Sequence, residues 1–265
     1  MYDVSYARAA SVPAAIEAFN DSDDPKFIAG GQTLIPTMKA RLAAPSELID
    51  VSQIDNLIGI CEDGELVIVG AATTHAAVHE SSLLQDRIPG LASLAGLIGD
   101  PMVRHRGTLG GSVANNDPSA DYPAALLALG ATIRTDRRDV RADDFFVDMF
   151  ETDLEEDELI TAIAFPVPRR CAYAKFPNPA SRYAMVGVMV AELADGSVRV
   201  AVTGAGASGV YRWTEAEDAL TADWGAEAVA NLKADPDDML EDMHGSADYR
   251  AHLVAVMTKR AVAGL

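Results

Sequence analysis

The sequence predicts an α+β protein in two parts, a larger N-terminal portion and a smaller one that begins near residue 170. The chain opens with a β-turn-α-β unit, in which short strands at 26–29 and 47–51 flank a helical stretch at 34–42. Two antiparallel hairpins follow, each with an Asp-Gly turn between apolar runs, at 56–74 and 184–204. Hairpin-linked strands with separate helices are typical of α+β folds.

Local signals place the remaining elements. Ser11 and Pro13 mark the start of one helix, and Gly130 marks the end of another. Pro166 and Pro168, just before a basic pair, indicate a boundary near residue 170. The other predicted elements are a helix at 11–19, a helical stretch at 74–97, a helix at 122–130, strands at 131–135 and 158–168, and alanine-rich helices from 214 onward.

Composition and charge exclude several classes of function. The formal net charge is −19 and the pI is near 4.5, whereas nucleic acids are bound through clustered Lys and Arg side chains. We therefore expect no nucleic-acid partner. No window holds the roughly eighteen consecutive apolar residues of a membrane span, and the N-terminal segment lacks the features of a signal peptide. We therefore expect a cytoplasmic protein with no membrane span.

The chain contains two cysteines, Cys61 and Cys171, far apart in the sequence. This number argues against a disulfide framework and a zinc ribbon. An iron-sulfur cluster normally takes four thiolate ligands. This chain therefore cannot build such a cluster by itself.

One glycine motif resembles a dinucleotide fingerprint but stands in the wrong context. The segment GAGASG at 204–209 fits G-x-G-x-x-G and follows a strand. That strand is the second arm of a predicted antiparallel hairpin, and VYRW follows the motif instead of an amphipathic helix. A Rossmann unit also needs a second parallel strand about twenty residues on. We interpret the motif as a close-packed turn.

Two glycine pairs form a better candidate for ligand binding. The first, at 30–31, lies between a predicted strand and a predicted helix, and the donors Gln32 and Thr33 follow it. The second, at 110–111, lies between the hydroxyls of Thr108 and Ser112. Each pair alone is compatible with a tight turn. Together they predict two backbone segments whose N–H groups converge on one anion, without the lysine of a P-loop.

The histidines give weaker signals. His75 and His79 have the i, i+4 spacing that can present two imidazoles to a metal, but no third ligand is evident. We therefore expect a structural pair and no metal site. His105 lies between Arg104 and Arg106, which suggests positive potential near a ligand more than proton transfer.

Two long segments carry a family resemblance. AGGQTLIPTMKARLAAPSELIDVSQI at 29–54 and IGDPMVRHRGTLGGSVANNDPSADYPAALLALGATI at 98–133 resemble the signature segments of the FAD-binding subunits of molybdenum hydroxylases. These include the medium subunit of carbon monoxide dehydrogenase and the FAD subunit of xanthine dehydrogenase. The resemblance continues, in order, through 173–191 and 200–220.

The resemblance implies a specific architecture. An FAD-binding domain of the vanillyl-alcohol-oxidase (PCMH) type would occupy 1–170, with subdomains of about 1–55 and 56–170. A C-terminal α+β domain at 171–265 would contain a three-stranded antiparallel sheet with helices.

The resemblance also implies a role for particular residues. The backbone N–H groups of the two glycine segments would wrap the FAD diphosphate, and Asp121 would bond the sugar chain of the flavin. Lys175 and Tyr183 would lie beside the isoalloxazine ring, and Ser112 stands where relatives often carry Asn or Asp. Asp121 is equally compatible with a helix N-cap. The residues thus assigned to FAD are Ala29, Gly30, Gly31, Gln32, Thr33, Leu34, Thr108, Leu109, Gly110, Gly111, Ser112, Asp121, Lys175 and Tyr183.

The function implied by the resemblance is electron transfer within a complex. FAD would accept electrons from an iron-sulfur small subunit and pass them to NAD or a quinone-type acceptor, with the molybdenum cofactor on a large subunit. The complex would be a dimer of heterotrimers, and this chain would supply no catalytic acid, base or nucleophile. One alternative is a stand-alone flavin oxidoreductase, although fewer than a hundred residues follow 170 to form a substrate domain. Another is a nucleotide-binding protein without flavin.

Overall fold

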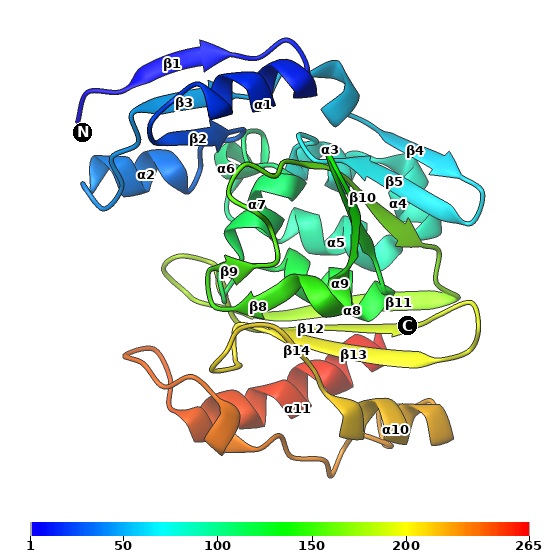
Figure 1. Ribbon diagram of the computed structural model, residues 1–265. Coiled ribbons are helices and arrows are strands. Elements are labelled where there is room, and N and C mark those ends of the chain that lie inside the picture. Colours follow the sequence, from blue (N-terminus) through cyan, green and yellow to red (C-terminus); the bar gives the residue numbers. More distant parts are fainter. Residues whose placement is uncertain (1, 265) are drawn as a thin grey trace.

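A computed structural model describes residues 2–264. Figure 1 shows three groups of elements stacked from the N-terminal unit, through a central group of helices and strands, to a C-terminal sheet with two helices on its far side. Among the described residues, no helix combines the length and apolar character needed to cross a membrane.

The N-terminal unit is a small parallel sheet with two helices. Its elements are β1 (Ser5–Arg8), α1 (Val12–Asn20), β2 (Pro25–Ile28), α2 (Leu34–Lys39) and β3 (Glu47–Asp50). β3 lies between β1 and β2 and pairs with both in parallel. Ser11 caps α1 by accepting a hydrogen bond from the N–H of Ala14. The predicted β-turn-α-β unit is therefore confirmed, and its turn joins β2 to α2.

The central group contains an antiparallel sheet in the order β4-β5-β10-β6-β7. The predicted hairpin at 56–74 forms β4 and β5. A second small sheet pairs β8 with β9. The strands are β4 (Ile60–Asp63), β5 (Leu66–Gly70), β6 (Thr132–Thr135), β7 (Asp139–Arg141), β8 (Phe146–Asp148), β9 (Glu151–Thr152) and β10 (Ile160–Pro166).

The sequence predicted one helical stretch at 74–97, but the structure has three separate helices there. The prediction of a continuous stretch was therefore wrong. The chain breaks at Ser81, whose hydroxyl accepts from the N–H of Leu84, and at Ile88, after which Pro89 opens the next helix. The central helices are α3 (His75–Glu80), α4 (Ser82–Arg87), α5 (Pro89–Gly96), α6 (Pro101–Arg104), α7 (Leu109–Asn115), α8 (Tyr122–Leu129) and α9 (Ala142–Phe145).

α8 is buried on all sides. A helix that is apolar around its whole circumference belongs in the interior of a protein, and α8 contacts α5 and β10 on one side and β12 and β13 on the other. Gly130 ends the helix in the left-handed region, with φ of +62°, as the sequence predicted.

The C-terminal sheet is antiparallel in the order β11-β12-β13-β14, with α10 and α11 on the face away from α8 (Figure 1). Its elements are β11 (Arg170–Pro177), β12 (Ala184–Glu192), β13 (Val198–Thr203), β14 (Tyr211–Arg212), α10 (Thr214–Ala222) and α11 (Ala247–Ala263). β12 is almost wholly buried, and the predicted hairpin at 184–204 is confirmed. In addition to the three expected strands, the sheet has a short fourth strand, the two-residue β14.

Two details of the C-terminal part refine the sequence interpretation. The segment 204–209 joins β13 to β14, and Gly204 has φ of +81° in a position where a Cβ atom would overlap the carbonyl of Ala184. It is a close-packed turn, as predicted. Helices do not fill the chain from 214 onward, because the stretch between α10 and α11 consists mostly of turns with one short 3₁₀ segment at Pro236–Asp238.

Candidate cofactor-binding site

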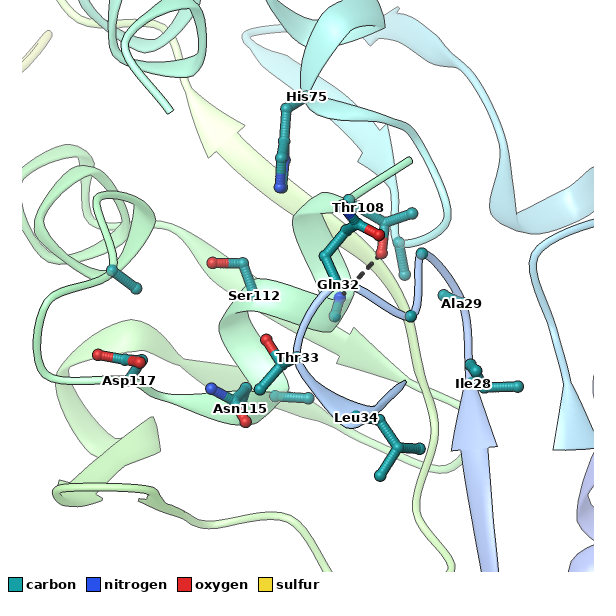
Figure 2. Close-up of a pocket in the computed structure, with 18 of the residues that line it drawn as sticks. Ile28, Ala29, Gln32, Thr33, Leu34, His75, Thr108, Ser112, Asn115 and Asp117 are labelled. Atoms are coloured by element: carbon teal, nitrogen blue, oxygen red, sulfur yellow. Dashed lines mark hydrogen bonds between the residues drawn. The ribbon is translucent and has the colours of Figure 1, made fainter. Parts of the chain in front are cut away.

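A cavity of about 550 Å³ lies where the N-terminal unit, the central helices and the C-terminal sheet meet. This volume is in the range of small-molecule and cofactor sites. Its walls come from the β2–α2 turn, the start of α7, the loop after α7, the end of β11 and the β11–β12 loop. Figure 2 shows Gln32 and Thr33 of the β2–α2 turn facing Thr108 and Ser112 of α7 across this space.

The β2–α2 turn depends on both of its glycines. Gly31 has φ of +68°, a conformation that strains any residue with a side chain. Gly30 packs against the segment before α7, where a Cβ atom would overlap the carbonyl oxygen of Arg106 and lie 2.7 Å from the Cα of Gly107. The pair therefore allows a left-handed turn and a close approach of two backbones.

This turn presents free backbone donors. Within residues 2–264, the N–H groups of Gly30, Gly31, Gln32 and Thr33 donate to no acceptor of the protein. Gly30 and Gly31 are partly buried, where N–H groups are normally paired, and a turn that aligns successive N–H groups forms an anion-binding concavity. The turn is therefore prepared for an anionic ligand in the cavity.

The second glycine segment has a different structure from the first. Thr108 caps α7, and its hydroxyl accepts from the N–H of Gly111 at 3.2 Å, the dashed line in Figure 2. The N–H of Leu109 donates to the carbonyl of Thr73 at 3.0 Å, and that of Gly110 donates to the carbonyl of Ala71 at 2.8 Å.

These bonds change what the second segment can offer a ligand. The N–H of Ser112 also donates within the protein, to the carbonyl of Thr108 at 3.1 Å. The backbone donors of 109–112 are therefore occupied, contrary to the expectation of a second set of free N–H groups. The segment faces the cavity with the Thr108 and Ser112 side chains instead (Figure 2).

The two glycines of α7 have different roles. Gly110 allows close packing against another segment, and Gly111 leaves space in the cavity. A Cβ atom on Gly110 would lie 2.6 Å from the Cβ of Ala71, so glycine lets α7 approach the end of β5. A Cβ atom on Gly111 would meet only the Thr108 hydroxyl, at 2.9 Å, because this residue faces the cavity.

Asp121 lies in a buried polar network with two residues of β11. Its carboxylate accepts from the Tyr173 hydroxyl at 2.6 Å and from the Lys175 ammonium at 2.9 Å. Lys175 also donates to the carbonyl of Leu97 at 3.1 Å, and its side chain is 3% exposed. Asp121 stands at the N-cap position of α8 but makes no capping hydrogen bond. Its side chain therefore joins the central helices to the C-terminal sheet at the wall of the cavity.

The electrostatics of this network follow from burial. Burial raises the pKa of Asp121, and the Lys175 ammonium and the Tyr173 hydroxyl oppose that rise. Burial, with the neighbouring Asp121, raises the pKa of Tyr173 well above its ordinary value. Tyr173 is therefore a neutral donor at physiological pH, and the carboxylate keeps acceptor capacity for a ligand hydroxyl.

Tyr183 ends the β11–β12 loop and is 48% exposed at the edge of the cavity. Asn178 shapes this loop, since its side-chain oxygen accepts from the N–H groups of Ala180 and Ser181. Burial raises the pKa of Tyr183, and the nearby carboxylates of Asp117 and Asp121 add to the rise. The loop places a neutral aromatic side chain beside the Asp121 network.

All the residues that the sequence assigned to the ligand line the cavity except Leu109. The Leu109 side chain is fully buried in the central hydrophobic core. The formal charges of the lining are balanced, with three cations and three carboxylates, so the free N–H groups provide the local attraction for an anion. The charged lining residues are Lys26, Lys175, Arg182, Asp117, Asp121 and Glu158.

Sequence reasoning missed several lining residues. His75 enters the cavity, whereas His79 bonds the carbonyl of Ala92 at 2.9 Å. The two rings thus have separate partners, and no group of three metal-binding side chains occurs among residues 2–264. Ile98 and Leu159 also line the cavity. Apolar residues of this kind give no signal in a single sequence, because they resemble core residues.

The fold and the site together define a protein with a cofactor-sized cavity between a glycine turn and the C-terminal sheet. The chain belongs to the family of FAD-binding subunits of molybdenum hydroxylases. Residues 2–168 match the family described as the FAD binding domain in molybdopterin dehydrogenase, and residues 171–265 match the CO dehydrogenase flavoprotein C-terminal domain. The resemblance noted in the sequence and the predicted fold class are confirmed.

Individual relatives are similar over nearly their whole length. The nicotine 6-hydroxylase medium subunit of Paenarthrobacter nicotinovorans is 35% identical, over 98% of this chain and 96% of its own. The carbon monoxide dehydrogenase medium chain of Hydrogenophaga pseudoflava is 36% identical, over 90% and 88%. The structure of reconstituted CO dehydrogenase from Oligotropha carboxidovorans superposes with a TM-score of 0.88 at 32% identity, covering 99% of this chain and 97% of the other.

Proposed function

We propose that the cavity holds FAD and that this chain is the electron-transfer subunit of a complex with an iron-sulfur subunit and a molybdenum-cofactor subunit. The observation that carries the proposal is the β2–α2 turn, whose residues 30–33 line a cavity of cofactor size and whose N–H groups donate to no described protein acceptor. An FAD-binding family match over 2–168 supports the same assignment. The proposed FAD-binding domain is 1–170, with subdomains divided near 55, and the C-terminal domain is 171–265.

Different groups of cavity residues are suited to bind different parts of FAD. The N–H groups of the β2–α2 turn would bind the diphosphate, and the hydroxyls of Thr108 and Ser112 would bond it from the opposite wall. Asp121 would accept from a hydroxyl of the ribityl chain. Lys175 and Tyr183 would lie beside the isoalloxazine ring.

The protein's contribution to the chemistry is binding and electrostatic control. FAD, when bound, supplies a redox centre that can take electrons singly and release them as a pair. The Asp121–Lys175 pair places a fixed, buried dipole next to the proposed ring position. The apolar walls formed by Ile98, Leu154 and Leu159 exclude water from the cofactor. None of these roles requires proton transfer by the chain.

The partner subunits are those that the family resemblance implies. Cys61 is exposed on β4 and Cys171 is buried beneath α5, so these two cysteines do not form a shared cluster site. In keeping with the family, we place the iron-sulfur clusters on a small subunit and the molybdenum cofactor on a large subunit. A dimer of heterotrimers in the cytoplasm, with NAD or a quinone as the acceptor, remains a prediction of the family resemblance.

The first test is the flavin content of the purified chain. We expect a yellow protein, or a colourless one that takes up added FAD at about one per chain. Gly111→Trp should abolish binding by filling the cavity, because a side chain at this position points into open space next to Thr108. Gly225→Trp is the matched control, since a Cβ atom there meets nothing within 4 Å. A wild-type chain that fails to bind added FAD would contradict the proposal.

The electron acceptor is tested in the assembled complex. Reduced complex is mixed with NAD or with a soluble quinone, and the return of the oxidised flavin absorbance is followed at each acceptor concentration. Saturable reoxidation by one acceptor class identifies it. Turnover of a substrate by the isolated chain would favour the alternative of a stand-alone flavin oxidoreductase.

A further inference from the structure

His75 is held at the start of α3 with its ring directed into the cavity (Figure 2). Thr74 caps the helix by accepting from the N–H of Ala77, and the N–H of His75 donates to the carbonyl of Gly107 at 3.0 Å. The side chain is buried, with the residue 5% exposed. Helix, cap and backbone contact therefore fix the ring in one place.

The tautomer of His75 follows from its contact with Tyr122. The Nδ1 atom lies 3.2 Å from the Tyr122 hydroxyl, which belongs to the fully buried helix α8. Among residues 2–264, this hydroxyl has no other hydrogen-bond partner. A buried O–H proton without an acceptor is costly, so Tyr122 donates to Nδ1. The ring proton of neutral His75 is then on Nε2.

His75 is neutral at physiological pH. Burial lowers the pKa of His75 to about 4, and the positive charge of Arg104 contributes to that fall. Tyr122 keeps its proton in the same range, because burial raises the pKa of Tyr122 well above its ordinary value. The pair therefore presents one N–H donor, at Nε2, and no positive charge.

This donor has no acceptor in the described part of the protein. The Nε2 atom lies beside Gly107, where a Cβ atom would be only 2.5 Å from it. Gly107 precedes Thr108 and packs against Gly30. The unpaired Nε2–H is therefore located where the two glycine segments meet at the cavity. The Nε2 atom is not enclosed by protein atoms but opens to the cavity, and the cavity is the place from which an acceptor can come.

We propose that His75 is a cofactor-binding residue whose Nε2–H donates a hydrogen bond to an oxygen of the phosphate or ribityl chain of FAD. Tyr122 is the positioning residue that holds the required tautomer. This inference rests on the proposed binding of FAD in the cavity, and it adds a neutral donor to the backbone N–H groups of the β2–α2 turn. It also explains why a histidine is buried here without a metal or a carboxylate partner.

The test compares two amides at position 75. The side-chain nitrogen of glutamine can reach the place of Nε2, whereas that of asparagine corresponds to Nδ1. We expect His75→Asn to weaken FAD binding about 10- to 100-fold, the range for loss of a hydrogen bond to a charged or strongly polar acceptor. His75→Gln should retain affinity within about threefold. FAD dissociation constants are measured by flavin fluorescence, with the thermal midpoint of each FAD-free variant as a folding control.

The role of Tyr122 is tested by a double-mutant cycle. Tyr122→Phe should weaken FAD binding about 3- to 10-fold beside a wild-type histidine, because the ring is no longer held in the Nε2–H tautomer. The same change in the His75→Asn background should have no further effect on FAD affinity. A purely structural role for Tyr122 would give equal losses in both backgrounds.

The outcomes separate this inference from the proposed function. If the wild-type chain does not bind FAD, the proposed function fails. If it binds FAD and both His75→Asn and Tyr122→Phe bind equally well, only the role of His75 is overturned. Nitrogen NMR of the FAD-free chain gives an independent readout, since the Nε2–H and Nδ1–H tautomers have distinct patterns of ¹⁵N shifts. An Nδ1–H tautomer would overturn the inference even if His75→Asn failed to fold.

Discussion

Gly30 lies so close to Arg106 that a Cβ atom on the glycine would overlap the arginine's carbonyl oxygen. This contact joins the β2–α2 turn to the segment that leads into α7, although the two are far apart in the sequence. The turn carries the free N–H groups, and the hydroxyls of Thr108, the N-cap of α7, and of Ser112 within α7 line the cavity. The geometry of the anion site therefore depends on a backbone contact that only glycine permits.

Gly30→Ala should separate these two segments. One added methyl group has no room against a backbone carbonyl, and overpacking of this kind costs about 1–3 kcal/mol. We expect FAD affinity to fall at least tenfold and the denaturant midpoint to decrease. Gly225→Ala, which adds a methyl group in open space, should leave both unchanged. Wild-type FAD affinity in Gly30→Ala would show that the contact does not shape the site.

Lys175→Met should destabilise the chain strongly, because it leaves Asp121 buried without its cation. Removal of one partner of a buried ion pair costs about 3–5 kcal/mol. The matched control is Lys259→Met, which breaks an exposed pair with Glu227 and should cost less than about 1 kcal/mol. Urea unfolding measures both changes. An equal, small effect of the two variants would contradict the importance assigned to the Asp121 network.

A second variant distinguishes stability from cofactor binding in the same network. Adding Asp121→Asn to Lys175→Met removes the uncompensated charge and should recover part of the lost free energy of unfolding. The double variant should still bind FAD more weakly than the wild type, because the carboxylate acceptor proposed for the ribityl chain is gone. Recovery of both quantities together would argue that Asp121 is structural only.

The parts of this fold that the sequence predicted are those with local causes. The Asp-Gly hairpins, the β2-α2-β3 unit and the end of α8 at Gly130 each depend on residues next to one another in the chain. The helical stretch at 74–97 was predicted incorrectly because its apolar pattern concealed the breaks at Ser81 and Ile88. Both breaks have local markers, a serine cap and a following proline.

The candidate site was predictable as a set of residues but not in its bonding. The N–H groups of Leu109 and Gly110 donate to carbonyl oxygens in the segment just after β5. These are tertiary contacts, and no sequence pattern indicates them. The partners of Asp121 are 52 and 54 residues away, on β11. The N–H groups of the β2–α2 turn and the Nε2–H of His75 can likewise be recognised as unpaired only when the positions of all nearby acceptors are known.

Thr108 combines a structural role with a proposed role in binding, and a comparison with a second helix cap separates the two. Thr108→Val removes the cap of α7 and should cost about 0.5–2 kcal/mol of stability together with FAD affinity. Thr108→Ser keeps the hydroxyl and should retain both. Ser246→Ala removes a comparable cap, on α11 far along the chain, and should lower stability without changing FAD affinity. Flavin fluorescence and urea unfolding give the two quantities.

Glu158 lies in the wall of the cavity and makes the stability of the fold depend on pH. Arg138 donates to both carboxylate oxygens of Glu158, each at 2.8 Å, and these bonds lower the pKa of Glu158 to about 2. The pKa in the folded state is thus below that of the unfolded chain, near 4.5. A depressed carboxyl pKa stabilises the fold above the unfolded-state value, and this contribution is lost as the pH falls from about 4.5 towards 2.

Arg138→Met should remove this contribution. We expect the free energy of unfolding at pH 7 to decrease modestly, because solvent screens the partly exposed arginine. The decline in stability of the wild type between pH 5 and pH 3 should be shallower in the variant. Arg137→Met, which affects the exposed Asp157 pair instead, should keep most of the wild-type slope. Urea midpoints measured across this pH range test the prediction, and identical slopes in wild type and Arg138→Met would contradict it.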